Sequence, residues 1–215
     1  PMQKSKRPHG PSSHGWIIPM LLAVVLLAAC SRPEPPQLGL GTLLPSAKPV
    51  TEFQLTDHHG QPFTLENLKD NWTFAFFGYT HCPDVCPTSM SILAQVQRKL
   101  EQQDGLDRLP QVVFVSVDPE RDSTALLSQF VPYFHPDFIG ASGDTHNTLK
   151  LSRQLGILYG KAEDSAADNY LVDHSAAIIL LDPDAALRAV FGIPHDADLI
   201  ASDFLAIKAY YEATQ

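Results

Sequence analysis

Cysteine is scarce in this chain of 215 residues, which contains only Cys30, Cys82 and Cys86. A disulfide between Cys82 and Cys86 would close a very short loop and would constrain the unfolded chain little. Structural cross-linking is therefore a weak explanation for this pair. Thioredoxin-type oxidoreductases place two residues between their cysteines and this chain places three, so a redox pair, a metal clamp and two plain loop cysteines all remain open.

Basic residues are also few, since 15 Lys and Arg stand against 24 Asp and Glu, a formal charge of −9. Residues 1–29 contain three basic residues and no acidic one, which leaves 12 basic and 24 acidic residues, a charge of −12, for the remainder. Binding to nucleic acid requires Lys and Arg to neutralise phosphates. We therefore expect no nucleic-acid partner.

Long hydrophobic runs are missing too, because the apolar stretch Trp16–Ala29 has 14 residues where a membrane span needs roughly 20. The stretch follows a basic start and ends in Leu27-Ala28-Ala29-Cys30, which resembles the bacterial lipobox. The resemblance implies a lipoprotein-type signal peptide over 1–29 and a lipid on Cys30. It also implies a membrane-anchored lipoprotein on the periplasmic side of the bacterial cell envelope. An ordinary cleaved signal or a short anchor is the alternative.

The segment after this signal is rich in proline and has little apolar periodicity. Such composition is typical of a linker. We therefore predict that 30–49 is a lipidated cysteine with a tether and that the folded domain covers 50–215, beginning near Val50.

The folded part alternates predicted strands and helices. Phe53–Leu65 has the alternation of a β-hairpin, and nearly continuous apolar runs predict buried strands at Trp72–Gly78, Gln111–Val117 and Ala176–Leu181. A returning strand is expected at Leu187–Ile193, and Gly160–Asn169 is expected to be a polar loop. Helices are expected to start at Pro87, Ser123, Asp144 and Asp196. This order predicts an α/β domain with a thioredoxin-like fold and an added N-terminal β-hairpin.

Cys82 and Cys86 fall between the first buried strand and the helix expected to begin at Pro87. Ligands in open α/β sheets collect at the carboxyl ends of strands, and a helix N-terminus favours a thiolate. Residues four apart can lie on one side of a helical turn. The two sulfurs can therefore form a disulfide or converge on one metal ion.

A metal site would need a third ligand, and histidine is the available type. His58 and His59 are expected at a solvated hairpin tip, His81 is expected to point away from Cys82, and His135, His146 and His195 are expected to face solvent. His174 differs, because it directly precedes the strand Ala176–Leu181. From the pattern alone it is either a ligand or an ordinary loop histidine. Two thiolates and one imidazole would suit copper, and zinc with an added water is the alternative.

Three separated motifs then resemble the Sco/SenC family. They are Phe77-Gly-Tyr-Thr-His-Cys-Pro-Asp-Val-Cys-Pro87, Val115-Ser-Val-Asp-Pro-Glu-Arg-Asp122 and Val172-Asp-His-Ser175. The resemblance covers about residues 50 to 213. It implies a copper-binding assembly protein with one copper ion held by Cys82, Cys86 and His174. Asp173, next to His174, is a candidate outer residue that orients the loop or tunes a cysteine, and a capping aspartate is the alternative. The implied partners are cytochrome c oxidase subunit II, or another copper enzyme, and a copper donor protein.

Two alternatives use the same cysteines. A thiol–disulfide reductase would cycle Cys82 and Cys86 between dithiol and disulfide and would not need His174. A peroxidase of the peroxiredoxin kind shares the expected fold, but the second and third motifs point elsewhere. The expected role is therefore that of a metallochaperone rather than an enzyme.

Overall fold

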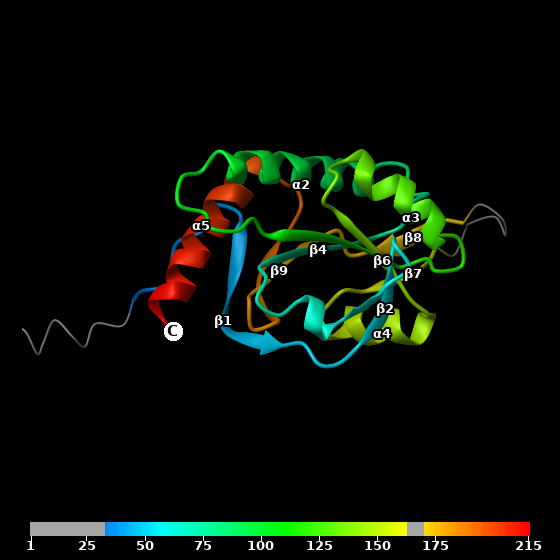
Figure 1. Cartoon of the computed structure of the whole chain (residues 1–215), viewed down its shortest axis with the longest axis horizontal. Helices are drawn as coiled ribbons and strands as arrows, with labels where there is room; N and C mark the ends of the chain where they lie inside the picture. The colour runs from blue at the N-terminus through cyan, green and yellow to red at the C-terminus, as the bar shows by residue number, and fades with distance from the viewer. Residues whose placement is uncertain (1–32, 163–169) are drawn as a thin grey trace, which may run out of the picture. The chain divides into compact units, whose positions relative to one another are not determined.

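The structure is a computed structural model that describes residues 33–162 and 170–215 (Figure 1). Its contacts divide the chain into two units, Pro36–Ala209 and Pro1–Pro35 with Tyr210–Gln215. The larger unit holds the sheets and the candidate site. The predicted signal segment and Cys30 lie outside the described residues.

An eight-stranded sheet forms the centre of the larger unit, in the order β1-β10-β9-β4-β5-β6-β2-β3. The strands β4, β5 and β6 are parallel, whereas the other neighbours in this sheet are antiparallel. Every residue of β4 is buried, as its continuous apolar sequence predicts. The strands are β1 (Gly41–Pro49), β2 (Gln54–Asp57), β3 (Pro62–Thr64), β4 (Thr73–Gly78), β5 (Gln111–Ser116), β6 (Ile139–Ser142), β9 (Ile178–Leu181) and β10 (Ala186–Phe191).

Helices pack on both faces of this sheet. Figure 1 shows α2 and α3 on one side and α4 on the other. Phe204 of α5 is fully buried and packs against the rings of Trp72 and Phe74. The α-helices of the described residues are α2 (Val85–Glu101), α3 (Thr124–Phe130), α4 (Thr145–Gln154) and α5 (Ala197–Ala213), and short 3-10 turns are η2 (Leu65–Asn67) and η3 (Val131–Tyr133).

A separate two-stranded sheet pairs β7 (Tyr159–Lys161) with β8 (Val172–His174). The prediction of a polar loop over Gly160–Asn169 is wrong at its start, since Gly160 and Lys161 belong to β7. The rest of that loop falls partly on residues 163–169, which the structure does not describe.

The predicted α/β class and the hairpin of β2 and β3 are confirmed. The predicted domain start near Val50 is wrong, because β1 begins at Gly41 and pairs with β10. The backbone N–H groups of Gly39, Leu40 and Gly41 donate to the buried carboxylate of Asp203 at 2.7 to 2.9 Å. This carboxylate on α5 fixes a segment whose proline content resembles that of a linker.

Within the described residues, no helix combines the length and the apolar character needed to cross a membrane. The apolar run Trp16–Ala29 lies outside those residues, so the predicted anchor is not tested by this finding.

Candidate metal centre

The cysteine loop connects β4 to α2. The strand ends at Gly78, and α2 begins at Val85 rather than at Pro87. Cys86 is therefore the second residue of the helix instead of preceding it. Pro87 still fits, because the N–H groups of the first helical turn have no partner inside the helix.

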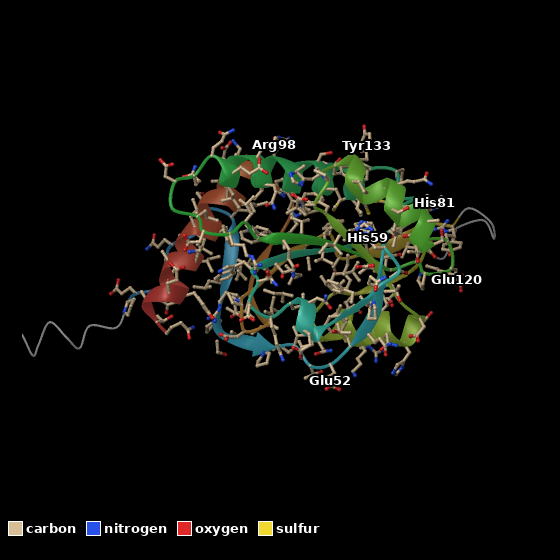
Figure 2. The ribbon with its side chains drawn as sticks, viewed as in Figure 1. Glu52, His59, His81, Arg98, Glu120 and Tyr133 are labelled. Atoms are coloured by element: carbon tan, nitrogen blue, oxygen red, sulfur yellow. The ribbon has the colours of Figure 1, made fainter. Side chains whose placement is uncertain are left out.

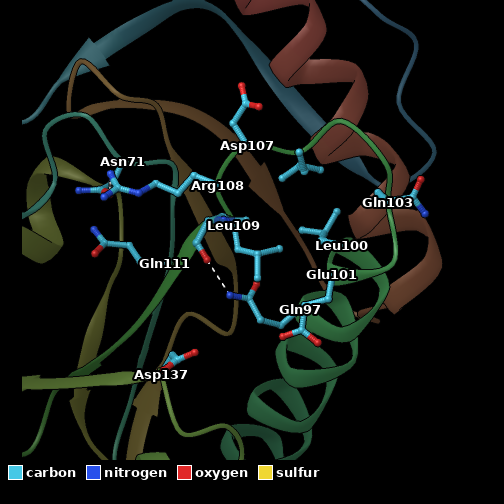
Figure 3. Close-up of a pocket in the computed structure, with 12 residues that line it drawn as sticks. Asn71, Gln97, Leu100, Glu101, Gln103, Asp107, Arg108, Leu109, Gln111 and Asp137 are labelled. Carbon is cyan, nitrogen blue, oxygen red and sulfur yellow. Dashed lines mark hydrogen bonds between the residues drawn. The ribbon is translucent and has the colours of Figure 1, made fainter.

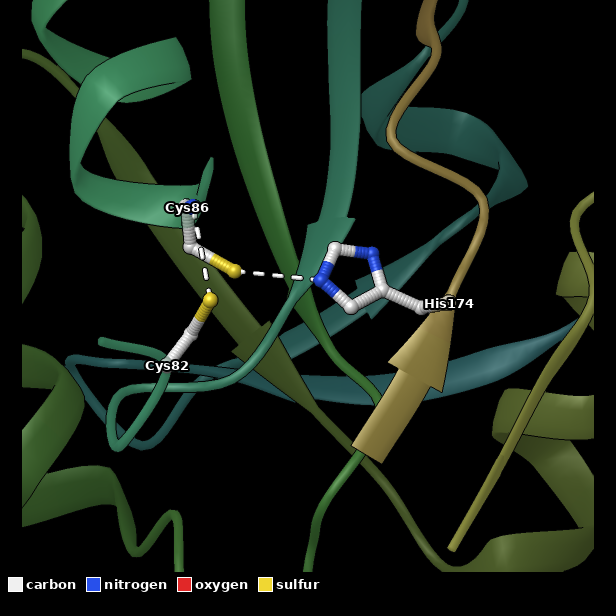
Figure 4. Close-up of side chains that lie close together, drawn as sticks. All are labelled: Cys82, Cys86 and His174. Carbon is white, nitrogen blue, oxygen red and sulfur yellow. Dashed lines mark hydrogen bonds between the residues drawn. The ribbon is translucent and has the colours of Figure 1, made fainter. Parts of the chain in front are cut away.

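The side chains of Cys82, Cys86 and His174 converge (Figure 4). Their ligand atoms all lie within 4.8 Å of one another, and His174 Nε2 is 3.2 Å from Cys86 Sγ. The backbone N–H of Cys86 donates to Cys82 Sγ at 3.4 Å, so this sulfur also satisfies a free donor at the helix N-terminus. Neither cysteine forms a disulfide.

His174 is held with one ring nitrogen toward the sulfurs. It is the last residue of β8, whereas the sequence pattern placed it in a loop before β9. Its Nδ1 lies 3.2 Å from the carbonyl oxygen of Ser175, and a proton on Nδ1 would donate to that oxygen and leave Nε2 with its lone pair. The rings of Phe76 and Tyr79 pack edge-on against the imidazole, each with centroids 6.0 Å away. The sequence did not predict the contact between Tyr79 and His174. The only local signal was the position of Tyr79 directly after an apolar run.

The two thiols differ in exposure. Cys86 is fully buried, while Cys82 and His174 are partly exposed. The three side chains therefore do not all lie on exposed loops, because Cys86 is inside the fold. Of the three residues, Cys82 and His174 are the ones with part of their surface exposed.

The two thiols also differ in acidity. The pKa of Cys82 is lowered to about 4, mainly because the Cys86 thiol hydrogen-bonds to its sulfur, with smaller help from His174 and the backbone N–H groups of Asp84 and Cys86. The pKa of Cys86 is raised, because its thiol is the partner of the Cys82 sulfur and because it is buried. The metal-free pair thus holds one thiolate, on Cys82, at neutral pH.

This difference predicts selective alkylation of the reduced, metal-free protein. Iodoacetamide should modify Cys82 at nearly the same rate at pH 6 and pH 8, because a thiol with a pKa of about 4 is fully ionised throughout. An ordinary thiol with a pKa of about 8.5 would react roughly 70-fold faster at pH 8. Peptide mass spectrometry of quenched samples gives the rate at each cysteine, and equal, steeply pH-dependent rates would contradict the assignment.

The other predicted site residues lie apart from this cluster. His81, which was expected to point away from Cys82, is exposed (Figure 2). Its Nδ1 lies 3.0 Å from Thr80 Oγ. Asp173 is exposed on β8, and successive strand residues point to opposite faces, so its carboxylate faces away from His174. His146 is exposed, as predicted.

Three histidines depart from the expectation that they face solvent. His58 is buried, and its Nδ1 accepts the N–H of Gly140 at 3.0 Å, because the hairpin tip packs against β6. His195 is partly buried with its Nδ1 3.1 Å from Ser89 Oγ. His135 is largely buried and lies 3.4 Å from a carboxylate oxygen of Glu101.

A cavity of about 570 Å³ lies elsewhere, between the end of α2 and the start of β5 (Figure 3). Its lining includes Gln97, Arg108 and Gln111 and none of the three converging residues. Because Gln111 begins β5, the cavity lies at the amino ends of the parallel strands, away from the cysteine loop. The candidate chemistry therefore belongs to the cluster rather than to this cavity.

The donor set suits a soft metal ion. Two ligand atoms that share an ion at about 2.0 to 2.3 Å lie at most about 4.6 Å apart, so the observed cluster needs only small adjustments. Thiolate and imidazole are ligands that copper accepts, and Cys82 is already ionised. The same two cysteines can also undergo thiol–disulfide exchange with a disulfide of another protein.

Comparison with known proteins agrees with this geometry. The family model described as SCO1/SenC matches residues 43–209. The mouse mitochondrial protein SCO2 homolog is 40% identical over 149 residues, which are 69% of this chain and 58% of that protein. A SCO2-like protein of Rickettsia felis is 33% identical over 162 residues, 74% of this chain and 78% of that protein. The chain thus spans little more than half the length of the mammalian relative.

Two solved structures extend the comparison. ScoI of Arabidopsis thaliana with copper bound is 34% identical, with a TM-score of 0.70, and the match covers 75% of this chain and 98% of that one. ScoI of Bradyrhizobium japonicum with copper bound is 36% identical, with a TM-score of 0.64 over 75% and 99% of the two chains. These similarities confirm the predicted thioredoxin-like fold. With its matching family model, related sequences and related structures, this chain belongs to the SCO1/SenC family.

Proposed function

We propose that this protein binds one copper ion through Cys82, Cys86 and His174. The observation that carries the proposal is the convergence of two sulfurs and one imidazole nitrogen within 4.8 Å from positions far apart in the chain. The copper-bound ScoI structures of related chains support the choice of metal. Zinc would need a fourth ligand such as water, because the cluster holds three metal-binding side chains and no fourth among the described residues.

The proposed role is delivery of copper to a partner, in cytochrome c oxidase assembly. Three ligands leave room for an incoming thiolate or imidazole, which can bind the ion before one of the original ligands leaves. The partial exposure of Cys82 and His174 gives that incoming group a route, while buried Cys86 retains the ion. The proposed acceptor is the binuclear copper site of cytochrome c oxidase subunit II, or another copper enzyme, and a donor protein would load the site.

The test is copper titration of the full chain beside His174→Ala, with metal analysis and EPR spectra of the Cu(II) form. We expect one copper per wild-type chain, and weaker binding with a changed nitrogen coupling in His174→Ala, because the variant loses the imidazole ligand. The fold should persist, since His174 is only partly buried at the end of a short strand. Wild-type protein that binds no copper after reduction would overturn the proposal.

A second candidate function is supported by the acidity of Cys82. A thiolate with a pKa of about 4 beside a neutral thiol is the arrangement of a thiol–disulfide reductase. Cys82 would attack a partner's disulfide, Cys86 would resolve the mixed disulfide, and the partner would leave as a dithiol while this pair becomes oxidised. His174→Ala separates the two functions, because it should retain reduction of a partner disulfide while binding copper more weakly.

The location remains part of the proposal. We propose attachment to the bacterial envelope through a lipid on Cys30, with the folded part on the periplasmic side. A role for Asp173 in orienting His174 also stays a prediction. Its carboxylate is exposed on β8, so it would act on His174 through the backbone that joins the two residues.

A further inference from the structure

The two halves of the metal centre come from different parts of the fold. Cys82 lies between β4 of the large sheet and α2, and Cys86 is the second residue of α2, whereas His174 ends β8 of the separate two-stranded sheet. The ladder hydrogen bonds of the large sheet do not include β8. His174 lies four residues before Ile178 of β9, which pairs with Phe76 of β4, so the chain connection to β9 holds one side of His174 and other contacts hold the rest of β8.

The turn after β5, Asp118–Asp122, touches the cysteine half through one carboxylate. Asp122 is buried and accepts the backbone N–H of Thr80 at 3.1 Å and its hydroxyl at 2.6 Å. It also accepts the hydroxyl of Ser116 at 2.7 Å. Thr80 lies two residues before Cys82, so Asp122 ties the loop that carries this sulfur to the end of β5.

The same turn touches the histidine half through a second carboxylate. Asp118 is buried and accepts the hydroxyl of Tyr170 at 2.5 Å. Arg121 hydrogen-bonds to Asp118 and lies over the ring of Tyr170, 3.6 Å from its centroid. Tyr170 lies two residues before the start of β8, and Lys161 of the paired strand β7 donates to Glu120 at 2.9 Å. These contacts dock the hairpin that ends in His174.

The turn itself is tightly closed. The carbonyl oxygen of Asp118 accepts the backbone N–H groups of both Arg121 and Asp122, at 3.1 and 2.9 Å. The Asp118 N–H donates to Ser116 Oγ, the same hydroxyl that donates to Asp122. The two carboxylates are therefore held at a fixed separation, and each points to a different half of the site.

We propose that the Asp118–Asp122 turn is a brace that sets the spacing between the sulfur ligands and His174, with Asp118 and Asp122 as positioning residues for the metal. The proposal rests on the proposed copper site. It assigns a function to the second of the three sequence motifs, which contributes no ligand of its own.

A merely structural role would predict a different result, and the chain offers a matched control. Asp203 is buried, like Asp122, and accepts three backbone N–H groups. It holds the start of β1, which is an edge strand of the large sheet and is not next to β4 or β5. Asp122→Asn and Asp203→Asn each weaken a buried carboxylate network and should lower the stability of the protein. If Asp122 positions the ligands, Asp122→Asn should also change the metal centre. If Asp122 only stabilises the fold, it should not.

The experiment compares full-length wild type, Asp122→Asn, Tyr170→Phe and Asp203→Asn. Cu(I) affinity is measured by competition with a chromophoric chelator, and the Cu(II) form is examined by absorption and EPR. We expect Asp122→Asn and Tyr170→Phe to weaken copper binding by about 10- to 100-fold, the usual effect of removing an outer contact of a metal site, with altered spectra. Asp203→Asn should keep wild-type affinity and spectra.

Tyr170→Phe removes only the hydroxyl that donates to Asp118, so it still tests the brace if Asp122→Asn fails to fold. A metal-free readout separates this inference from the proposed function. Amide hydrogen exchange of the apo protein should become faster in the loop that carries Thr80 and Cys82 in Asp122→Asn and in β8 in Tyr170→Phe, because each variant loses a contact that holds that segment, and it should not change there in Asp203→Asn, whether or not copper binds to any of them. Copper affinities, spectra and exchange rates in these segments that match those of wild type in both brace variants would overturn the brace.

Discussion

Cys86→Ser is expected to lose stoichiometric copper binding. The sulfur of Cys86 is fully buried and lies 3.2 Å from His174 Nε2, so it occupies the innermost ligand position of the cluster. A hydroxyl is a hard, weakly acidic group and a poor replacement for a thiolate on copper. The loss of affinity should exceed the roughly 10- to 100-fold cost of removing an outer contact. Chelator competition and metal analysis on the purified chain measure it.

The third cysteine of the chain provides the control for this result. Cys30→Ser leaves the cluster intact and should bind one copper with wild-type affinity. Far-UV circular dichroism of Cys86→Ser should match that of wild type, since serine fits within the volume of cysteine. If Cys86→Ser bound one copper as tightly as wild type, Cys86 could not be a ligand.

Gly78→Ala is expected to damage both the fold and the metal centre. A Cβ at this position would lie 2.8 Å from Cys86 Sγ and 3.0 Å from the ring of Phe114. Both neighbours are fully buried and cannot move without disturbing their surroundings. Overpacking of this kind costs about 1–3 kcal/mol of unfolding free energy, and relief by movement of Cys86 Sγ would also weaken copper binding. Urea unfolding and chelator competition measure the two effects.

Gly192→Ala is the matched substitution, because a Cβ there would meet nothing within 4 Å. It should leave copper binding unchanged and can raise stability slightly by restricting the unfolded chain. Equal stability and equal copper affinity for the two variants would mean that the cysteine loop tolerates a side chain at residue 78.

Periodicity and turn residues predicted the elements near the site with small errors. The buried strand before the cysteines and the helix after them were both expected, although α2 begins two residues earlier than Pro87 suggested. The error arose because proline was assigned to the first helical position, whereas all of the first turn tolerates it. The start of the domain was misjudged for a different reason. Pairing of Gly41–Pro49 with β10 and its anchoring to Asp203 are long-range contacts that leave no local pattern.

The histidines show the same limit. The pattern singled out His174 but left it as a ligand or a loop residue, and only the resemblance of its motif favoured a ligand. Its convergence with the cysteines is a tertiary contact between residues 88 apart in sequence. His58 was assigned to solvent because it lies at a hairpin tip, yet that tip packs on β6 and buries the ring.

The sequence by itself determined which chemistry is available. It contains two cysteines after a buried strand, one histidine in a recognisable motif, and too few basic residues for nucleic acid. The tertiary structure decided what those residues become. It gives Cys82 a low pKa and Cys86 a high one, aims His174 Nε2 at the sulfurs, and places two buried carboxylates behind the site. The reason is that ionisation and ligand geometry depend on distances and burial, which neighbours remote in the sequence create.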